Sequence, residues 1–170
     1  RSRAIGLELS DVLLAGASVL AVLLVFAAYQ GSVHAARMTG GAAANTGGLY
    51  DPATNIWSAT ATAGAPGARL TPAAVWAPER GEMIVFGGVG EGPRYSDGGR
   101  YDPVANTWSQ FPKKSPVQTT LQSGVWTGVE LIVWGGAQIP ARTNEGARYV
   151  AATDTWSRIA TNGAPVARER

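Results

Sequence analysis

Short apolar runs separated by turn-forming residues recur along the last two thirds of the chain. The clearest runs are Glu82–Phe86 and Glu130–Trp134, and each is followed by a Gly-Gly pair. Runs of this length that are rich in Val, Ile and aromatic residues and bounded by Gly or Pro are typical of buried strands. The pattern predicts strands at residues 49–51, 56–60, 73–77, 82–86, 99–102, 107–111, 122–127, 130–134, 147–150 and 155–159.

The strand pattern recurs with a period near 50 residues. The spacings between Trp57, Trp108 and Trp156 are 51 and 48 residues, and a Tyr precedes each Trp by seven positions (Tyr50, Tyr101 and Tyr149). The pair Gly87-Gly88 lies 48 residues before Gly135-Gly136. A fixed period of this length indicates a repeat architecture. We therefore predict two full units of four strands, preceded by a half unit that supplies only the last two.

An apolar strand ending in Gly-Gly, followed by Tyr and Trp at these spacings, resembles the kelch repeat. The resemblance covers about residues 49–170, and the stretch 125–136 is especially similar to bacterial kelch proteins. It implies an all-β fold, a partial kelch β-propeller of about two and a half four-stranded blades. The residues themselves suit structural roles, because glycines permit sharp backbone turns and Tyr and Trp fill the space between sheets. These structural repeat residues are Gly87, Gly88, Gly135, Gly136, Tyr50, Trp57, Tyr101, Trp108, Tyr149 and Trp156.

Two and a half blades are too few to close a ring, since propellers usually contain four to eight. The terminal sheets would then expose apolar faces and unpaired strand edges. Three arrangements remain open: a fragment of a longer protein, an assembly of several copies, or an open array. The start at Arg1 and the stop at Arg170 within a repeat favour the fragment.

An apolar run without a charged residue precedes the repeats at residues 12–29. As a helix these residues would span about 27 Å, close to the thickness of the hydrocarbon core of a membrane. We predict that residues 1–35 are a signal peptide or, slightly favoured, a transmembrane anchor; a buried soluble helix is the third alternative. Residues 36–48 are small and polar and are predicted to be a linker. The repeats would then lie outside the cytoplasm, as a secreted, periplasmic or cell-surface domain.

Composition restricts the chemistry. The chain has no cysteine, which excludes disulfides, thiolate chemistry and Cys-based metal sites. Its net charge is +2 and its only adjacent basic pair is Lys113-Lys114, so a nucleic-acid surface is not favoured. The single histidine, His34, precedes the repeats, so no Ser-His or metal-His constellation can form within them. No catalytic residue, metal ligand or cofactor is predicted.

The loops between the second and third strands differ most between the two full units. They are residues 89–97 and 137–145. Loops on a rigid scaffold commonly carry function, and in kelch propellers these loops often line the ligand face. Arg94, Tyr95, Arg142 and Asn144 are therefore candidates for ligand binding, with solvated loop residues as the alternative.

The predicted function is a binding scaffold, not an enzyme, which recognises a protein or a glycan through loop side chains. The chain would contact a membrane only through residues 12–29, if these are not removed. The alternative is a fragment of a galactose-oxidase-like or sugar-mutarotase-like enzyme whose catalytic residues lie in further blades.

Overall fold

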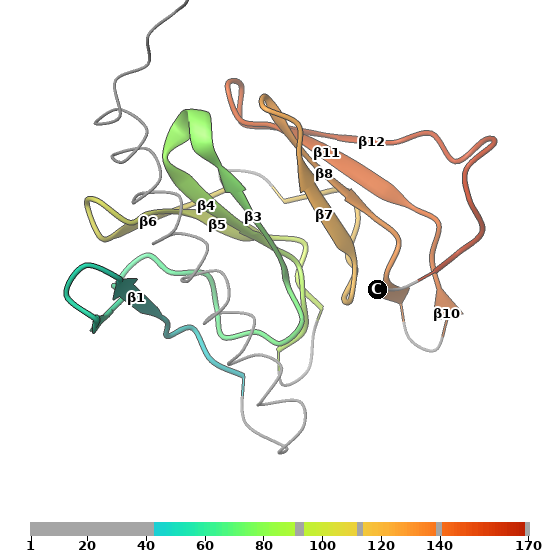
Figure 1. Cartoon of the computed structure of the whole chain (residues 1–170). Coiled ribbons are helices and arrows are strands. Elements are labelled where there is room, and N and C mark those ends of the chain that lie inside the picture. The colour runs from blue at the N-terminus through green and yellow to red at the C-terminus, as the bar shows by residue number, and fades with distance from the viewer. Residues whose placement is uncertain (1–42, 91–93, 112–113, 139–140, 169–170) are drawn as a thin grey trace, which may run out of the picture.

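The computed structural model describes residues 43–90, 94–111, 114–138 and 141–168, which form an all-β molecule (Figure 1). These residues build four antiparallel sheets, two of four strands and two of two strands. The hydrophobic helix predicted at residues 12–29, the boundary at residue 35 and the first part of the predicted linker lie outside the described residues. Within the described ranges, no helix has the length and apolar character needed to cross a membrane.

Every predicted strand is present, with its ends within one residue of the prediction. The strands are β1 Gly48–Asp51, β2 Ile56–Ala59, β3 Ala73–Ala77, β4 Glu82–Phe86, β5 Gly98–Asp102, β6 Thr107–Gln110, β7 Ser123–Trp126, β8 Glu130–Trp134, β9 Ala137–Gln138, β10 Ala141–Arg142, β11 Gly146–Val150 and β12 Thr155–Arg158. Strands β9 and β10 were not predicted, and the 3-10 turn η1 (Pro78–Arg80) joins β3 to β4. Ala44, in the predicted linker, forms an isolated bridge with Arg69, so pairing begins before β1.

The two four-stranded sheets have the same strand order. The middle sheet has the order β3-β4-β5-β6, and the end sheet has the order β7-β8-β11-β12. Strands β1 and β2 form a separate hairpin. Aspartate side chains stabilise the hairpin turns. In the β5–β6 turn, Asp102 Oδ1 accepts the main-chain N–H of Val104 (2.8 Å) and of Ala105 (3.0 Å). Asp51 caps the first hairpin turn in the same manner, through Ala53 N at 2.9 Å.

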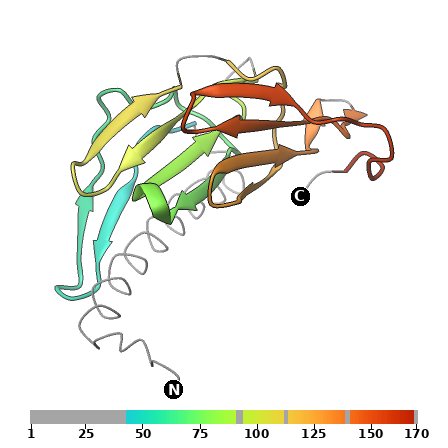
Figure 2. The same ribbon diagram turned by 90° about the horizontal axis from the view of Figure 1, so that it is seen from above.

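The hairpin, the middle sheet and the end sheet follow one another across the molecule (Figure 2). Strand β4 explains the order of these layers, because its alternate residues point to opposite faces of the sheet. Ile84 and Phe86 belong to the core cluster shared with the end sheet. Met83 and Val85 belong to a second cluster, which Leu49 of the hairpin joins. Both faces of the middle sheet are covered, which is why β4 is apolar along its whole length.

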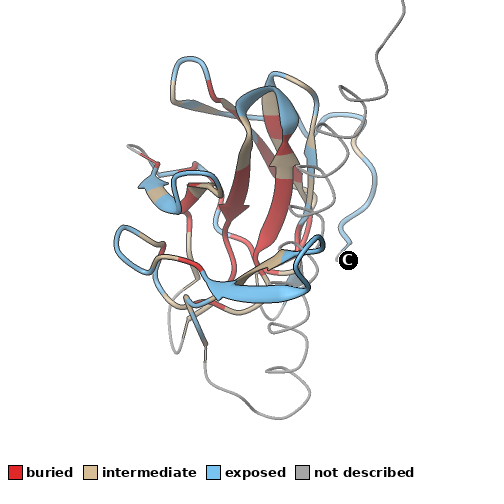
Figure 3. Ribbon diagram, turned by 60° about the vertical axis from the view of Figure 1, so that its left-hand side comes forward, coloured by how far each residue is buried: buried red, intermediate tan, exposed pale blue. Residues whose placement is uncertain are grey.

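Burial follows the same layering. The central strands of the middle sheet are buried, whereas every residue of β2 is exposed (Figure 3). In the end sheet, burial alternates along β8, where Leu131 and Val133 are buried and Ile132 is only half-buried. Within the part of the chain that the structure describes, both faces of the middle sheet are therefore covered, and one face of the end sheet is.

Candidate functional site

Two Gly-Gly turns lie at the same end of the two four-stranded sheets, directly after β4 and β8. Gly88 and Gly136 have φ angles of 93° and 95°, in the left-handed region that favours glycine. A Cβ atom on either residue would lie 2.5 Å from a main-chain oxygen, of Leu70 or Thr120 respectively. Close backbone approach and the positive φ angle therefore both favour glycine at these two positions.

The chain returns from each glycine turn along the same path. The N–H of Tyr95 donates to Gly88 O at 2.9 Å, and the N–H of Thr143 donates to Gly136 O at 3.0 Å. Each bond of one loop has its counterpart 48 residues further along the sequence in the other loop. The two loops thus have matching backbone anchors but different side chains at the anchored position, an aromatic ring in one and a hydroxyl in the other.

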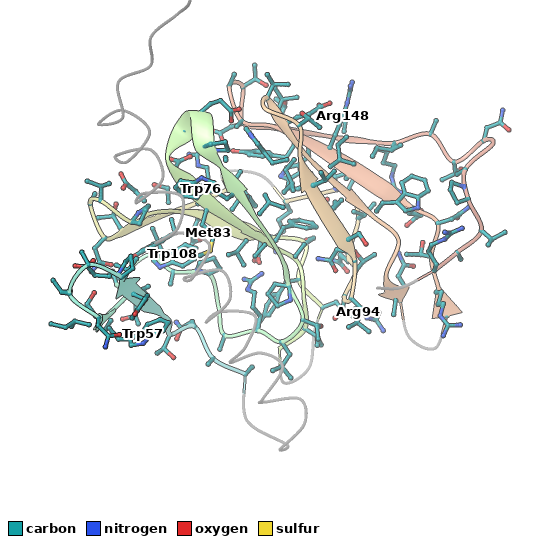
Figure 4. All side chains as sticks on the ribbon, viewed as in Figure 1. Trp57, Trp76, Met83, Arg94, Trp108 and Arg148 are labelled. Carbon is teal, nitrogen blue, oxygen red and sulfur yellow. The ribbon has the colours of Figure 1, made fainter. Side chains whose placement is uncertain are left out.

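The candidate arginines hold matching places in these two loops. Arg94 forms an isolated bridge with Val89, and Arg142 pairs with Ala137 in the β9–β10 ladder. Arg94 is half-buried and Arg142 is exposed. Figure 4 places Arg94 at the loop end of the molecule, well away from Trp76 and Met83 in the sheet. The fold therefore brings both arginines to one end of adjacent sheets.

The other two candidates lie at the same end. Asn144 is half-buried and follows Thr143, the anchored residue of the second loop. Tyr95 is half-buried, and its ring lies under the guanidinium of Arg69, whose Cζ is 4.4 Å from the ring centroid. Tyr95 therefore has a structural partner already, and contact of these four side chains with a ligand stays a prediction.

Arg69 is the main residue of this end that the sequence did not reveal. It is only 1% exposed, and its guanidinium makes four hydrogen bonds. Nε donates to Gly67 O (2.9 Å), and Nη1 donates to Gly87 O (2.9 Å) and Asp97 O (3.1 Å). Nη2 donates to Asp97 Oδ1 at 2.9 Å. A buried arginine is tolerated when its donors are satisfied in this way. Here Arg69 binds both ends of the first loop, at Gly87 and at Asp97, to the segment that precedes β3.

The sequence indicates the local turn that contains Arg69 but not the tertiary contacts of its side chain. The stretch 64–69 is similar to 163–168, so Arg69 matches Arg168. Arg168 Nε donates to Val166 O at 3.3 Å, which parallels the local bond from Arg69 Nε to Gly67 O. The local turn is thus recognisable from sequence, whereas the bonds to Gly87 and Asp97 depend on the tertiary fold.

The second loop is held by different chemistry. Thr119 matches Arg69, because it precedes Thr120, which bonds Ala137 as Leu70 bonds Val89. Glu145 matches Asp97, because its main-chain oxygen accepts the N–H of Gly135 as that of Asp97 accepts the N–H of Gly87. Without a buried arginine beside it, Glu145 accepts bonds from Arg158 Nη1 (2.8 Å) and Gln138 Nε2 (3.0 Å). Arg158 is an exposed residue of β12 and Gln138 is a half-buried residue of β9, whereas the arginine that holds the first loop is buried.

The Tyr and Trp residues of the repeat pattern are packing residues. Ring centroids are 5.1 Å apart in Tyr50–Trp57, 5.0 Å in Tyr101–Trp108 and 5.1 Å in Tyr149–Trp156. Burial, and then the negative charge of Asp102, raise the pKa of Tyr101 to about 12. Burial, and then its hydrogen bond to Asp154, raise the pKa of Tyr149 further still. These phenols therefore stay protonated and act as hydrogen-bond donors at neutral pH.

Each of these tyrosines donates to the residue five positions later. Tyr50 Oη and Tyr101 Oη donate to Asn55 Oδ1 and Asn106 Oδ1, each at 2.7 Å, and Tyr149 Oη donates to Asp154 Oδ1. The acceptor has a positive φ angle in all three hairpins, between 50° and 58°. Asn and Asp tolerate this conformation better than most residues, which explains their recurrence at that position.

The described residues contain no group of three or more His, Cys, Asp or Glu side chains that could hold a metal ion.

The end of the molecule with the two glycine turns presents a pair of arginine-bearing loops on a framework of sheets. Comparison with known families and proteins gives no match, either to a family model or to a curated protein.

Proposed function

We propose that the chain is a binding module, part of a kelch-like β-propeller, which recognises a protein or a glycan through the loops that carry Arg94 and Arg142. One observation carries this proposal: the two loops have the same backbone anchors at Tyr95 and Thr143 but different side chains. A fixed backbone with variable side chains is the arrangement by which scaffolds present recognition surfaces. The shared order of the two four-stranded sheets supports the kelch-like part of the proposal.

The chemistry of the loops favours a ligand that carries carboxylates. Arginine presents a planar set of donors that matches a carboxylate, and such charged bonds are stronger than neutral ones. Asn144, between the anchored Thr143 and Glu145, adds an amide that can both donate and accept. An acidic sugar or a Glu- and Asp-rich protein surface fits these groups.

The sequence of residues 1–35 places this module outside the cytoplasm in our proposal, as a secreted or membrane-anchored domain. The alternative, a part of a kelch enzyme whose catalytic groups lie in other blades, stays a prediction of the sequence. We favour the binding module because the two arginine loops share matching backbone anchors.

The proposal is tested by measuring binding of the full chain, in mild detergent, to an array of acidic and neutral glycans and to acidic peptides. Arg94→Ala and Arg142→Ala should each weaken binding about tenfold or more, since a charge-assisted hydrogen bond is lost. Arg80→Ala is the matched control, because Arg80 lies in the turn η1 at the opposite end of the middle sheet. No binding to any member, or equal weakening by all three substitutions, contradicts the proposal.

A further inference from the structure

The interface between the middle sheet and the end sheet contains a cross-strand row of four residues. Val75, Ile84, Arg100 and Ser109 are successive register partners on β3, β4, β5 and β6. We term them the covered row. Val75 is 8% exposed and Ile84 is fully buried. The end sheet, whose Tyr149 and Trp156 belong to the same core cluster, covers this row except at its last residue, Ser109, which is exposed.

The arginine of the covered row makes polar contacts across this interface. Arg100 Nη1 lies 3.3 Å from Tyr149 Oη and 3.4 Å from Asp154 Oδ1. Its side chain is only 15% exposed. The interface therefore combines apolar packing with one arginine that reaches the Tyr-acceptor pair of the next hairpin.

The end sheet carries the same row on its outer face, where nothing among the described residues covers it. Val125, Ile132, Arg148 and Ser157 are successive register partners on β7, β8, β11 and β12. We term them the exposed row. It matches the covered row residue for residue: Val, Ile, Arg, Ser. Val125 is 55% exposed, and so is the side chain of Arg148.

The hairpin carries the other half of the same interface. Tyr50 and Trp57 are register partners, and the alternation of strands turns them away from the middle sheet, on which their neighbour Leu49 packs. Their rings are 5.1 Å apart, as in Tyr149–Trp156, and Tyr50 Oη bonds Asn55 Oδ1 as Tyr149 bonds Asp154. Trp57 is 53% exposed.

Among the described residues, both complementary surfaces of an interface that the molecule already forms internally are thus uncovered. The two surfaces lie on opposite sides of the molecule, with Trp57 and Arg148 far apart in Figure 4. We propose that the exposed row binds the Tyr50–Trp57 face of a second copy of this chain. Val125 and Ile132 pack against the Tyr50 and Trp57 rings, and Arg148 donates to Tyr50 Oη and Asn55 Oδ1, as Arg100 does inside the molecule.

An interface of this kind joins different surfaces of two identical chains. Such head-to-tail contacts give rings when the rotation closes and open chains when it does not. A substitution at either surface therefore blocks one side of each copy and leaves the other side competent. This property separates the proposed contact from non-specific association through apolar residues, which has no such pairing rule.

The test measures self-association of the full chain in detergent by sedimentation equilibrium. Val125→Asp in the exposed row and Trp57→Ser in the hairpin should each weaken self-association at least about tenfold, because a charge or a lost ring removes the apolar contact. Mixing the two variants should restore one interface and give a 1:1 dimer that grows no further. Val104→Asp is the matched control, since Val104 is 95% exposed in the β5–β6 turn, outside both surfaces.

A second measurement covers the case in which Trp57→Ser fails to fold. The chain has no native cysteine, so a short bismaleimide can join Arg148→Cys of one copy to Asn55→Cys of another. Cross-linking between these two variants, and not between either one and Val104→Cys, supports the proposal. A wild-type chain that stays monomeric at about 100 μM, equal weakening by Val104→Asp, or a mixture of blocked variants without dimers overturns it.

Discussion

Arg69 Nη2 lies 2.9 Å from Asp97 Oδ1, and Arg69 Nη1 lies 3.1 Å from the main-chain oxygen of the same aspartate. The arginine is 1% exposed, whereas the side chain of Asp97 is 40% exposed. The pair therefore joins a buried donor to an acceptor at the surface. It closes the loop that carries Arg94, one of the two arginines of the proposed binding end.

Arg69→Ala should lower the free energy of unfolding by about 3 kcal/mol, because the oxygens of Gly87 and Asp97 lose their donor inside the fold. Arg69→Lys should recover little of this loss, since an ammonium group cannot reproduce the planar set of donors. Urea unfolding measures both. The control Arg80→Ala removes the Arg80–Glu82 pair (2.7 Å), which is partly exposed, and should cost less than about 1 kcal/mol. Equal losses at Arg69 and Arg80 would contradict this interpretation.

The glycine turns predict a second matched comparison. Gly88→Ala places a Cβ 2.5 Å from Leu70 O, whereas a Cβ at Gly81 meets nothing within 4 Å. Both residues have positive φ angles, 93° and 62°, so both substitutions carry backbone strain. Gly88→Ala should be more destabilising than Gly81→Ala by about 1–3 kcal/mol, which is the cost of overpacking. Thermal unfolding of the two variants gives this difference, and similar midpoints would argue against close approach at Gly88.

The two matched rows predict different costs for the same substitution. Ile84→Ala, in the covered row, should lower stability by about 2–5 kcal/mol because Ile84 is fully buried. Ile132→Ala, in the exposed row, should cost clearly less in a dilute sample, since Ile132 is only half-buried. Denaturant unfolding at low protein concentration compares them. If Ile132→Ala is as costly as Ile84→Ala, the outer face of the end sheet is not free in the single chain.

Alkaline pH should weaken the fold through Tyr101, whose pKa is raised to about 12 by burial and the charge of Asp102. An unfolded tyrosine ionises near pH 10, so between about pH 10 and pH 12 the unfolded chain binds fewer protons than the folded one. The contribution of Tyr101 to the free energy of unfolding is therefore fully present below pH 10 and is lost as the pH rises toward 12. Unfolding curves of wild type and Tyr101→Phe over this range should converge, because the variant lacks the titrating group. A constant difference between them would exclude this linkage.

Strand positions were predictable because they depend on local patterns. Runs such as Glu82–Phe86 combine β-branched and aromatic residues with flanking turn signals, and the structure reproduces their ends. Strands β9 and β10 escaped prediction because two residues each, Ala137–Gln138 and Ala141–Arg142, are too short to show any alternation. Their pairing follows from the glycine turn that precedes them.

The candidate site was predictable in place but not in its anchoring. Sequence variation between two loops pointed to Arg94 and Arg142, and the fold brings both to the same end of adjacent sheets. Arg69 was missed because an arginine among Gly, Ala and Pro has the pattern of a solvated turn. Its burial depends on Gly87 and Asp97, which lie 18 and 28 residues further along the chain.

The residue that accepts the hydrogen bond of the tyrosine hydroxyl differs between the hairpins, and this difference determines which sheet can pack next to which. Asn106 uses both ends of its amide: Oδ1 accepts Ala61 N–H at 2.7 Å, and Nδ2 faces Ala59 O at 3.4 Å. Asp154 instead offers a negative charge to Arg100. A permuted gene that exchanged the two sheets would set the carboxylate of Asp154 against the main-chain oxygen of Ala59, where Asn106 now places its Nδ2. The choice between Asn106 and Asp154, which differ only by an amide nitrogen in place of an oxygen, thus makes two sheets of nearly identical sequence pattern non-interchangeable.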